Sequence, residues 1–360
     1  MVLSPILNLM EPVLLYFNKM NVNQFPDRII EIDQEKYLYF GGTAYLGLST
    51  NKVFQELVVK NILIWGTTYG SSRNANVKVT AYENGETFLA NYIKAEAVVT
   101  VSSGMLAGKL VINELKKQTD TFFHFDDVHT AIQTTNSLPV IIAGKLNSRL
   151  LDEKEEKITI LTDGVPSFET NPIDLKVLRG ISKNKEITLL IDESHSLGIL
   201  GKNGCGIYAD INLPIKRKIM VSSLGKALGL TGGVIASDAS FIEEIKKSEI
   251  FGSAAGMNPA FAQTLADAAE LYPNQHQKLV ENLNYIDQKL IKDDSIKFDK
   301  SYPLIYLKDK NVIEILKENK IIIASFKYKQ NADNLNRIVV TANHIQEDLD
   351  KLINILNQNR

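Results

Sequence analysis

Short apolar runs alternate with longer helical patterns through the middle of the chain. The runs are rich in valine, isoleucine and other strand-forming residues, and they lie at residues 97–101, 122–125, 139–142, 158–161, 187–191, 219–221 and 233–236. Near-continuous apolar strands separated by helices indicate a mostly parallel sheet that is buried on both faces. We therefore expect an α/β fold in which the polar residues after these strands gather where open α/β sheets bind ligands.

The C-terminal part of the chain has a different pattern. Strand-like runs at residues 303–307, 321–323 and 337–340 alternate with helices, and apolar positions at helical spacing between Ile345 and Leu356 close the chain. We expect a smaller C-terminal α+β domain, with the boundary in the helical stretch at residues 261–290. The predicted division is an N-terminal segment of residues 1–42, a large domain of residues 43–270 and a small domain of residues 271–360.

The apolar N-terminus fits a short amphipathic helix better than a membrane span or an export signal. Ile6, Met10, Leu14 and Phe17 have helical spacing, but prolines and polar residues interrupt the stretch and no basic segment precedes it. We expect this helix to pack on the body of the protein or on a partner subunit, and we expect a cytoplasmic protein.

Composition and charge are those of an ordinary globular protein. The 360 residues are 44% hydrophobic and 23% charged, which is enough to bury a large core. A net charge of −2 gives no electrostatic footprint for nucleic acid or for an anionic membrane surface. Cys205 is the single cysteine, so an intrachain disulfide is excluded and a reducing compartment is suitable.

Two strand ends carry residues that make chemical sense together. Asp192 ends one apolar run and His195 follows three positions later, whereas Lys226 follows the next run beside a glycine. Alone, such an aspartate is as often a metal ligand or a helix cap, and such a lysine is more often a surface cation. Together they supply what a pyridine-based electron sink needs, an acid partner for the ring nitrogen and a lysine that forms a Schiff base.

A third segment suits the phosphate of the same cofactor. Ser103, Gly104 and Met105 follow the strand at residues 97–101, where small residues at a strand-to-helix turn leave amides free to bind an anion. Ser223, just before Lys226, lies at a similar turn. We therefore expect pyridoxal 5'-phosphate as the cofactor, with no metal ion.

Six segments, in order along nearly the whole chain, resemble one enzyme family. They are YLGLS at residues 45–49, SG at 103–104, DDVH at 126–129, DESH at 192–195, GK at 225–226 and RIVVTANH at 337–344. The chain is similar to the α-oxoamine synthases, which are fold-type-I pyridoxal-phosphate transferases and include 8-amino-7-oxononanoate synthase, to which the likeness is strongest. The resemblance implies a large domain with a mostly parallel central sheet, a smaller C-terminal α+β domain and a homodimer.

The resemblance also assigns roles to individual residues. Lys226 matches the Schiff-base lysine, Asp192 the partner of the ring nitrogen, and His129 the histidine that stacks on the pyridine ring. These three are the expected catalytic residues.

Further contacts follow from the same match. His195 and Ser167 match residues that contact the ring hydroxyl, and Ser223 matches a phosphate contact. Ser253 matches a phosphate contact lent by the neighbouring subunit. Arg337 matches the arginine whose planar fork meets both oxygens of the substrate carboxylate.

Two segments depart from the family pattern near the expected substrates. Thr43 and the alanine after it replace the usual Asn-Asp before YLGL, and the family asparagine helps to bind the substrate. Arg73 lies in a loop that keeps little of the family's glycine-rich sequence near the acyl donor. Thr43 and Arg73 are therefore candidate substrate contacts.

The implied activity joins an amino acid, L-alanine first of all, to a pimeloyl thioester of coenzyme A or of a carrier protein, with loss of carbon dioxide, as in biotin synthesis. An aminotransferase, or a synthase for another amino acid or acyl chain, uses the same lysine, aspartate and arginine and stays open. A non-catalytic partner subunit would have no need to retain all of these residues.

Overall fold

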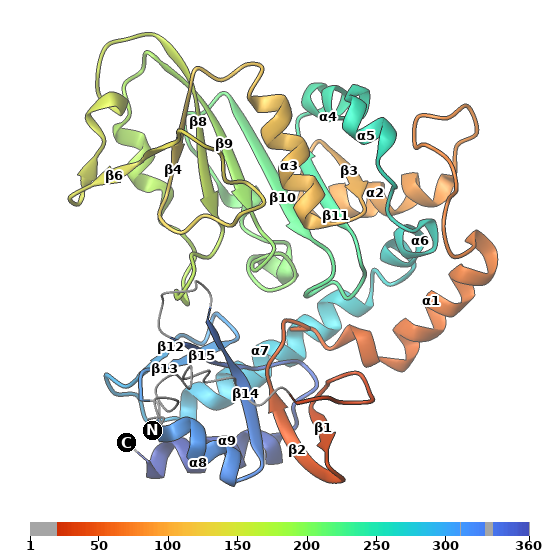
Figure 1. Cartoon of the computed structure of the whole chain (residues 1–360), viewed down its shortest axis with the longest axis vertical. Helices are drawn as coiled ribbons and strands as arrows, with labels where there is room; N and C mark the ends of the chain where they lie inside the picture. Colours follow the sequence, from red (N-terminus) through yellow and green to blue (C-terminus); the bar gives the residue numbers. More distant parts are fainter. Residues whose placement is uncertain (1–19, 310, 328–333, 360) are drawn as a thin grey trace, which may run out of the picture.

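A computed structural model describes residues 20–309, 311–327 and 334–359, so the helix expected between residues 2 and 17 lies outside the described residues (Figure 1). The chain forms two larger sheets, which lie at opposite ends of the view in Figure 1, and helix α7 (Leu271–Lys289) runs between them.

The larger sheet has the strand order β3-β11-β10-β9-β8-β4-β5. Its strands are β3 (Ala97–Val101), β4 (Thr121–His124), β5 (Leu138–Pro139), β8 (Glu156–Asp163), β9 (Lys185–Asp192), β10 (Arg217–Ser223) and β11 (Gly233–Ser237). The strands from β10 to β5 run parallel, and β11 is antiparallel to both of its neighbours. The predicted α/β fold with a mostly parallel sheet is therefore confirmed.

Both faces of this sheet are buried, as the apolar runs predict. Along β10, Ile219 and Val221 belong to an apolar cluster with helix α3, whereas Met220 between them belongs to the cluster on the opposite face. The helices between β2 and α7 are α1 (Lys52–Trp65), α2 (Thr80–Ile93), α3 (Gly104–Leu115), α4 (Ala239–Lys247), α5 (Glu249–Ser253) and α6 (Pro259–Asp267). Short 3₁₀ turns lie at Leu48–Thr50, Ser148–Leu150, Leu175–Gly180, Lys202–Gly204 and Tyr208–Asp210.

The run at residues 139–142 is not the single strand that its sequence predicts. Pro139 ends β5 at the edge of the large sheet, and β6 (Ile141–Ile142) pairs instead with β7 (Lys145–Leu146) in a separate hairpin. Proline has no amide hydrogen to donate, which suits an edge and not the interior of a sheet. Ala143 and Gly144 both have positive φ and form the turn of the hairpin.

The smaller sheet is assembled from both ends of the described chain. Its order is β1-β2-β14-β15-β13-β12, with β1 (Ile29–Ile32), β2 (Glu35–Phe40), β12 (Ile296–Phe298), β13 (Leu304–Leu307), β14 (Ile321–Lys327) and β15 (Asn334–Val339). Helices α8 (Asn311–Glu318) and α9 (Gln346–Gln358) accompany it. The hairpin of β1 and β2, which the sequence pattern does not predict, joins β14 through a parallel pairing of β2.

This hairpin lacks the usual sequence signal at its turn. Asp33 and Gln34 both take positive φ, a conformation that Asn-Gly or Asp-Gly normally marks in a sequence. The N-terminal strands thus belong to the same sheet as the C-terminal ones. The division of the chain into domains at residues 42 and 270 stays a prediction.

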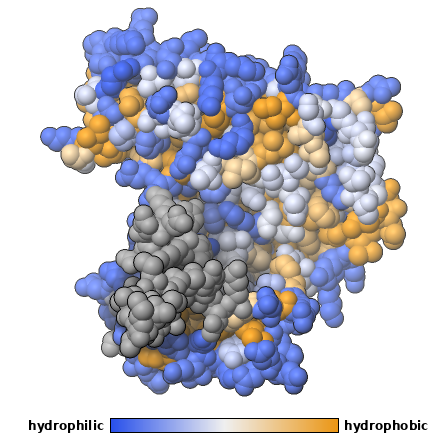
Figure 2. Space-filling model, viewed as in Figure 1, coloured by the Kyte–Doolittle hydropathy of each residue, from blue (hydrophilic) through white to orange (hydrophobic). Residues whose placement is uncertain are grey.

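One side of α1 carries exposed apolar residues. Val59, Leu63 and Ile64 are 57%, 82% and 61% exposed. Figure 2 shows apolar surface along the right edge of the view, where α1 lies in Figure 1. Contiguous exposed apolar surface on a folded chain commonly marks an interaction site.

Candidate active site

The carboxyl ends of three neighbouring parallel strands define the site. Asp163 at the end of β8 pairs in register with Asp192 at the end of β9, and Asp192 pairs with Val221 near the end of β10. The turns after β9 and β10 carry His195 and Lys226. Because parallel strands end at the same edge, side chains from distant parts of the sequence meet here.

Lys226 lies next to His195. The Lys226 Nζ atom is 2.8 Å from the Nε2 atom of His195. Burial lowers the pKa of the Lys226 ammonium and the charge of Arg337 adds to this effect, whereas Asp192 and Asp163 oppose it. A lowered pKa makes more of the neutral amine available, which is the form that attacks an aldehyde.

Asp192 is buried beneath this pair. One carboxylate oxygen accepts a hydrogen bond of 2.8 Å from the amide of Ser194, and the other lies 3.7 Å from His129 Nδ1. The His129 side chain is 36% exposed, so its ring borders open space as well as the carboxylate. The expected trio of Lys226, Asp192 and His129 is therefore brought together at one place, although the role of each stays a prediction.

Asp163 is a site residue that the sequence analysis did not select. Its Oδ1 atom accepts a hydrogen bond of 3.1 Å from the amide of His129. Burial, and after it the neighbouring Asp192 carboxylate, raises the pKa of Asp163 to about 8. The rule that singled out Asp192, an acidic residue at the end of an apolar run, applies equally to Asp163 and could have found it.

A tight turn beside the lysine forms a cradle for an anion. A Cβ atom on Gly104 would lie 2.9 Å from the Cα atom of Ser223, and one on Gly233 would lie 2.2 Å from the carbonyl oxygen of Ser103. Ser103 caps α3, because its Oγ atom accepts from the amide of Leu106 at 3.2 Å. The close approach of the helix start to the end of β10 therefore depends on glycine.

The donors of this cradle suit a phosphate group. Gly104 and Met105 are the first residues of α3, so no preceding turn of helix offers carbonyl groups to their amides. These amides lie at the positive end of the helix dipole, which favours an anion. Ser223 lies against the same turn and Lys226 follows it. An anion cradle, a half-buried lysine, a buried carboxylate and two histidines together fit pyridoxal 5'-phosphate.

The opposite wall of the site comes from the small sheet. Arg337 on β15 pairs in register with Tyr306 on β13. A cavity joins this wall to the strand ends, and its lining residues are His129, Asp163, Val165, Pro166, Ser167, Phe168, His195, Tyr302, Leu304, Tyr306 and Arg337. Ser167 and Arg337 thus share a cavity with His129 and His195, and the predicted contacts of each residue stay predictions.

Three other expected residues lie differently. Arg73 donates to Glu86 at 2.8 Å and to Thr100, stacks over an aromatic ring, and is 10% exposed in its side chain. Ser253 lies exposed at the end of α5, where its hydroxyl donates to the carbonyl of residue 249. Thr43 is half-buried in the loop after β2. The expected substrate and phosphate contacts of these three residues stay predictions.

The comparisons with known proteins agree with this geometry. A family model described as aminotransferase class I and II matches residues 141–356. The chain belongs to this family, whose members share the fold-type-I scaffold and pyridoxal phosphate as cofactor.

Individual relatives of the chain within this family include two kinds of synthase. The 8-amino-7-oxononanoate synthase of Petrotoga mobilis is 27% identical over 89% of this chain and 88% of its own. The serine palmitoyltransferase of Sphingobacterium spiritivorum is 26% identical over 77% of this chain and 72% of its own. The solved structure of Sphingomonas wittichii serine palmitoyltransferase matches 94% of this chain and 91% of its own with a TM-score of 0.78 at 18% identity, which bears on the fold.

Both kinds of relative are α-oxoamine synthases, so the resemblance expected from the sequence is confirmed. The expected fold, the cofactor and the enzyme class, a pyridoxal-phosphate-dependent acyltransferase resembling 8-amino-7-oxononanoate synthase, are confirmed with it. Among the described residues, no helix is long and apolar enough to cross a membrane. The described residues also contain no cluster of three or more side chains suited to hold a metal ion.

Proposed function

We propose that this protein condenses an amino acid with an acyl thioester and releases carbon dioxide and an α-oxoamine. Alanine and a pimeloyl thioester, of coenzyme A or of a carrier protein, are the first substrates to test. The observation that carries the proposal is the single cavity in which His129, His195 and Arg337 meet beside Lys226. The names of the relatives at 26–27% identity support the reaction class.

On the cofactor side of the site, different residues contact the ring nitrogen, the phosphate and the face of the ring. When bound, pyridoxal 5'-phosphate supplies an electron sink for the charge released at the substrate Cα. The buried Asp192 side chain would hold a proton on the ring nitrogen, and the amides that begin α3 would bind the phosphate with Ser223. His129 bounds one side of the cavity, where its ring can lie against the ring of the cofactor.

The substrate side supplies orientation and proton transfer. Arg337 binds the amino-acid carboxylate through its guanidinium fork and so fixes the Cα–H bond with respect to the ring. Lys226, with its lowered pKa, accepts the Cα proton and later returns one. The new bond joins Cα to the acyl carbonyl carbon, the thiol departs, and the original carboxylate leaves as carbon dioxide.

An assay with two readouts separates this reaction from its alternative. Purified protein loaded with cofactor is incubated with alanine, glycine or serine, each with short, dicarboxylic or long-chain acyl coenzyme A thioesters. We expect equimolar free thiol and carbon dioxide with one preferred pair, and none when either substrate is omitted. Keto acid formed without thiol would identify an aminotransferase instead, and no turnover with any pair would contradict the synthase.

We further propose a cytoplasmic homodimer. The exposed apolar side of α1 supports a second copy as its occupant, and the single cysteine, Cys205, is buried and suits a reducing compartment. Ser253 is the candidate phosphate contact across such an interface. An active species that elutes as a monomer at assay concentration would contradict the dimer, and Leu63→Asp is expected to weaken it.

A further inference from the structure

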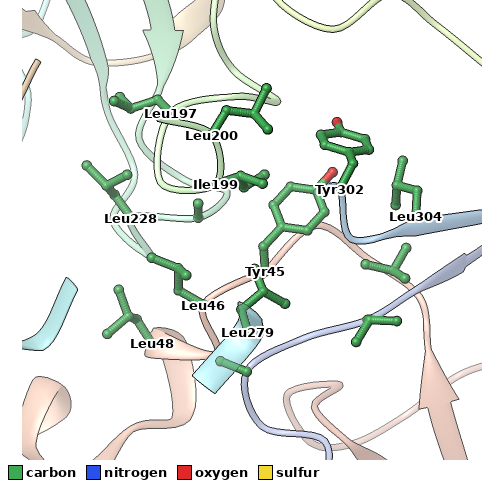
Figure 3. Packing of buried hydrophobic residues seen from close by; sticks show 14 of the residues in the cluster. Tyr45, Leu46, Leu48, Leu197, Ile199, Leu200, Leu228, Leu279, Tyr302 and Leu304 are labelled. Carbon is green, nitrogen blue, oxygen red and sulfur yellow. The ribbon is translucent and has the colours of Figure 1, made fainter. Parts of the chain in front are cut away.

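Tyr45 contacts His195 in the candidate active site, and the proposed chemistry gives this tyrosine no role. It begins the YLGLS segment, is fully buried, and has its hydroxyl 2.9 Å from the Nδ1 atom of His195. Since His195 Nε2 lies 2.8 Å from Lys226, both ring nitrogens of this histidine have a partner. Figure 3 shows the Tyr45 ring pointing toward Tyr302 within the apolar packing that joins the two sheets.

The surroundings of His195 keep its ring neutral. Burial lowers the pKa of His195 well below its usual value, and the charges of Lys226, Arg337 and His129, which face the ring, act in the same direction. A neutral imidazole carries one proton, and the partner of one nitrogen decides which nitrogen holds it. The identity of that partner therefore determines what the other nitrogen can donate.

Tyr45 is suited to be a donor to this ring. Burial raises the pKa of its hydroxyl to about 12, so the hydroxyl keeps its proton across the working pH range. The hydroxyl of Tyr302 donates to the backbone carbonyl of His195 at 3.1 Å, which fixes the same residue from its main chain. A neutral Lys226 amine can then accept from Nε2–H.

The backbone that carries Tyr45 is held from several directions. Ala342 donates its amide to the carbonyl of Tyr45 at 2.9 Å, and Gln275 donates its side chain to the next carbonyl at 2.8 Å. Asn343 donates to the carbonyl of Gly47 at 3.1 Å, and a Cβ atom on Gly47 would lie 2.3 Å from this asparagine. The TANH motif at residues 341–344 thus holds the segment that brings Tyr45 to His195.

We infer that Tyr45 is a positioning residue: its hydroxyl donates to His195 Nδ1 and thereby places the single imidazole proton on Nε2, directed at the ring hydroxyl of the cofactor. This inference rests on the proposed contact of His195 with that hydroxyl. It requires no assumption about the amino acid or the acyl donor.

The visible absorption of the bound cofactor reports on this contact without any substrate. A donor to the ring-hydroxyl oxygen stabilises its deprotonated form, so loss of the donor raises the apparent pKa of the pH-dependent absorption change. For Tyr45→Phe we expect a rise of about 0.5 to 1 unit, a three- to tenfold change in proton affinity. His195→Gln should shift the titration in the same direction by at least as much.

A matched control is available in the same core. Tyr272 is fully buried, and its hydroxyl has no hydrogen-bond partner among the described residues. Tyr272→Phe therefore removes a buried hydroxyl without touching His195, and its titration should overlay that of the wild type. An unshifted Tyr45→Phe titration beside a shifted His195→Gln titration would overturn the inference, as would an equal shift in Tyr272→Phe.

A measurement on the wild type keeps the inference testable if Tyr45→Phe fails to fold or to bind the cofactor. In cofactor-loaded protein labelled with ¹⁵N only at its five histidines, the chemical shifts of the ring nitrogens identify the tautomer of His195. A protonated Nε2 and an unprotonated Nδ1 support the inference. A proton on Nδ1 would overturn it, and neither result depends on whether the synthase reaction occurs.

Discussion

The two walls of the candidate active site are built in different ways. The wall at the large sheet consists of strand ends and the turns after them: Asp163 and Asp192 end β8 and β9, and Lys226 lies in the turn after β10. The wall at the small sheet combines Tyr45 from the loop after β2 with Tyr302 and Arg337 from the far end of the chain.

The difference explains how one scaffold can keep its cofactor chemistry and change its substrates. On the first wall, the ends of paired parallel strands and the turns directly after them place the chemical groups, so we expect changes there to alter the reaction itself. On the second wall, the groups contact the site through side chains on loops and on a mixed sheet, where substitutions alter binding and orientation. Variants on the two walls should therefore change different kinetic parameters, and by different amounts.

The largest effect is expected at Lys226. Lys226→Ala removes both the covalent anchor and the base at Cα, so kcat/KM should fall by at least about 10³-fold. The variant should also lose the cofactor linkage that borohydride reduces, which mass spectrometry of the treated protein detects. Lys218→Met is the matched control, because Lys218 is a half-buried lysine on β10 whose Nζ bonds the carbonyl of Tyr208. Retention of a reducible linkage in Lys226→Ala would refute the assignment.

Asp192→Asn comes next on the same wall. An amide cannot hold the proton of the ring nitrogen by charge, so kcat should fall by about 10²-fold or more while the cofactor stays bound. Asp238→Asn is a suitable comparison. Asp238 follows β11, which runs antiparallel to β10, so it lies at the opposite end of the strands from Asp192, where it caps α4. Asparagine also caps helices well, so this control should keep full activity. Equal losses in both variants, measured at saturating substrate, would argue against a role for Asp192.

The difference between the walls also sets how far the sequence could predict the molecule. The apolar periodicity and the polar residues at strand ends predicted the large sheet except at residues 139–142, together with the turns after β9 and β10 and the helix start at Gly104. The contact of Tyr45 with His195 spans 150 positions, and no local pattern encodes it. The hairpin of β1 and β2 was missed because its turn is Asp33-Gln34 and lacks glycine.

Arg73 has contacts that its sequence position does not reveal, and these contacts leave its predicted role at the substrate untested. An arginine in a loop expected near the acyl donor suggested a substrate contact. In the folded chain its guanidinium forms a largely buried ion pair with Glu86. Glu86 lies thirteen positions from Arg73 in the sequence, and it also accepts a hydrogen bond from the amide of Thr100. The sequence does not show that α2 packs against the strand at Thr100, so it does not reveal this ion pair.

On the small-sheet wall, Arg337→Lys should weaken binding of the amino acid. The substitution keeps the charge but loses the fork, and a charge-assisted hydrogen bond is worth about 1.5–3 kcal/mol, or about 10- to 100-fold in kcat/KM. We expect the loss mainly in the KM of the amino acid, with the KM of the thioester little changed. Arg217→Lys, in an ion pair with Asp238, provides the control. A loss confined to kcat would place Arg337 with the chemical groups instead.

The last prediction concerns Asp163 and the pH dependence of stability, and we expect its effect on the catalysed reaction to be the smallest of the four. Its folded pKa of about 8 lies above the usual value near 3.8, because burial disfavours the charged form, so the folded state binds more protons than the unfolded state between these values. Stability contributed by the neutral carboxyl is therefore present at low pH and is lost as the pH rises toward 8.

In cofactor-free protein, Asp163→Asn should reduce the fall in unfolding free energy between about pH 5 and pH 8, by at most about 1.4 kcal/mol per pH unit. Urea unfolding at several pH values measures this slope, with exposed Asp210→Asn as the control. Parallel curves for wild type and Asp163→Asn would mean that Asp163 is ionised in the folded chain, and the two carboxylates at the strand ends would then differ less than their positions indicate.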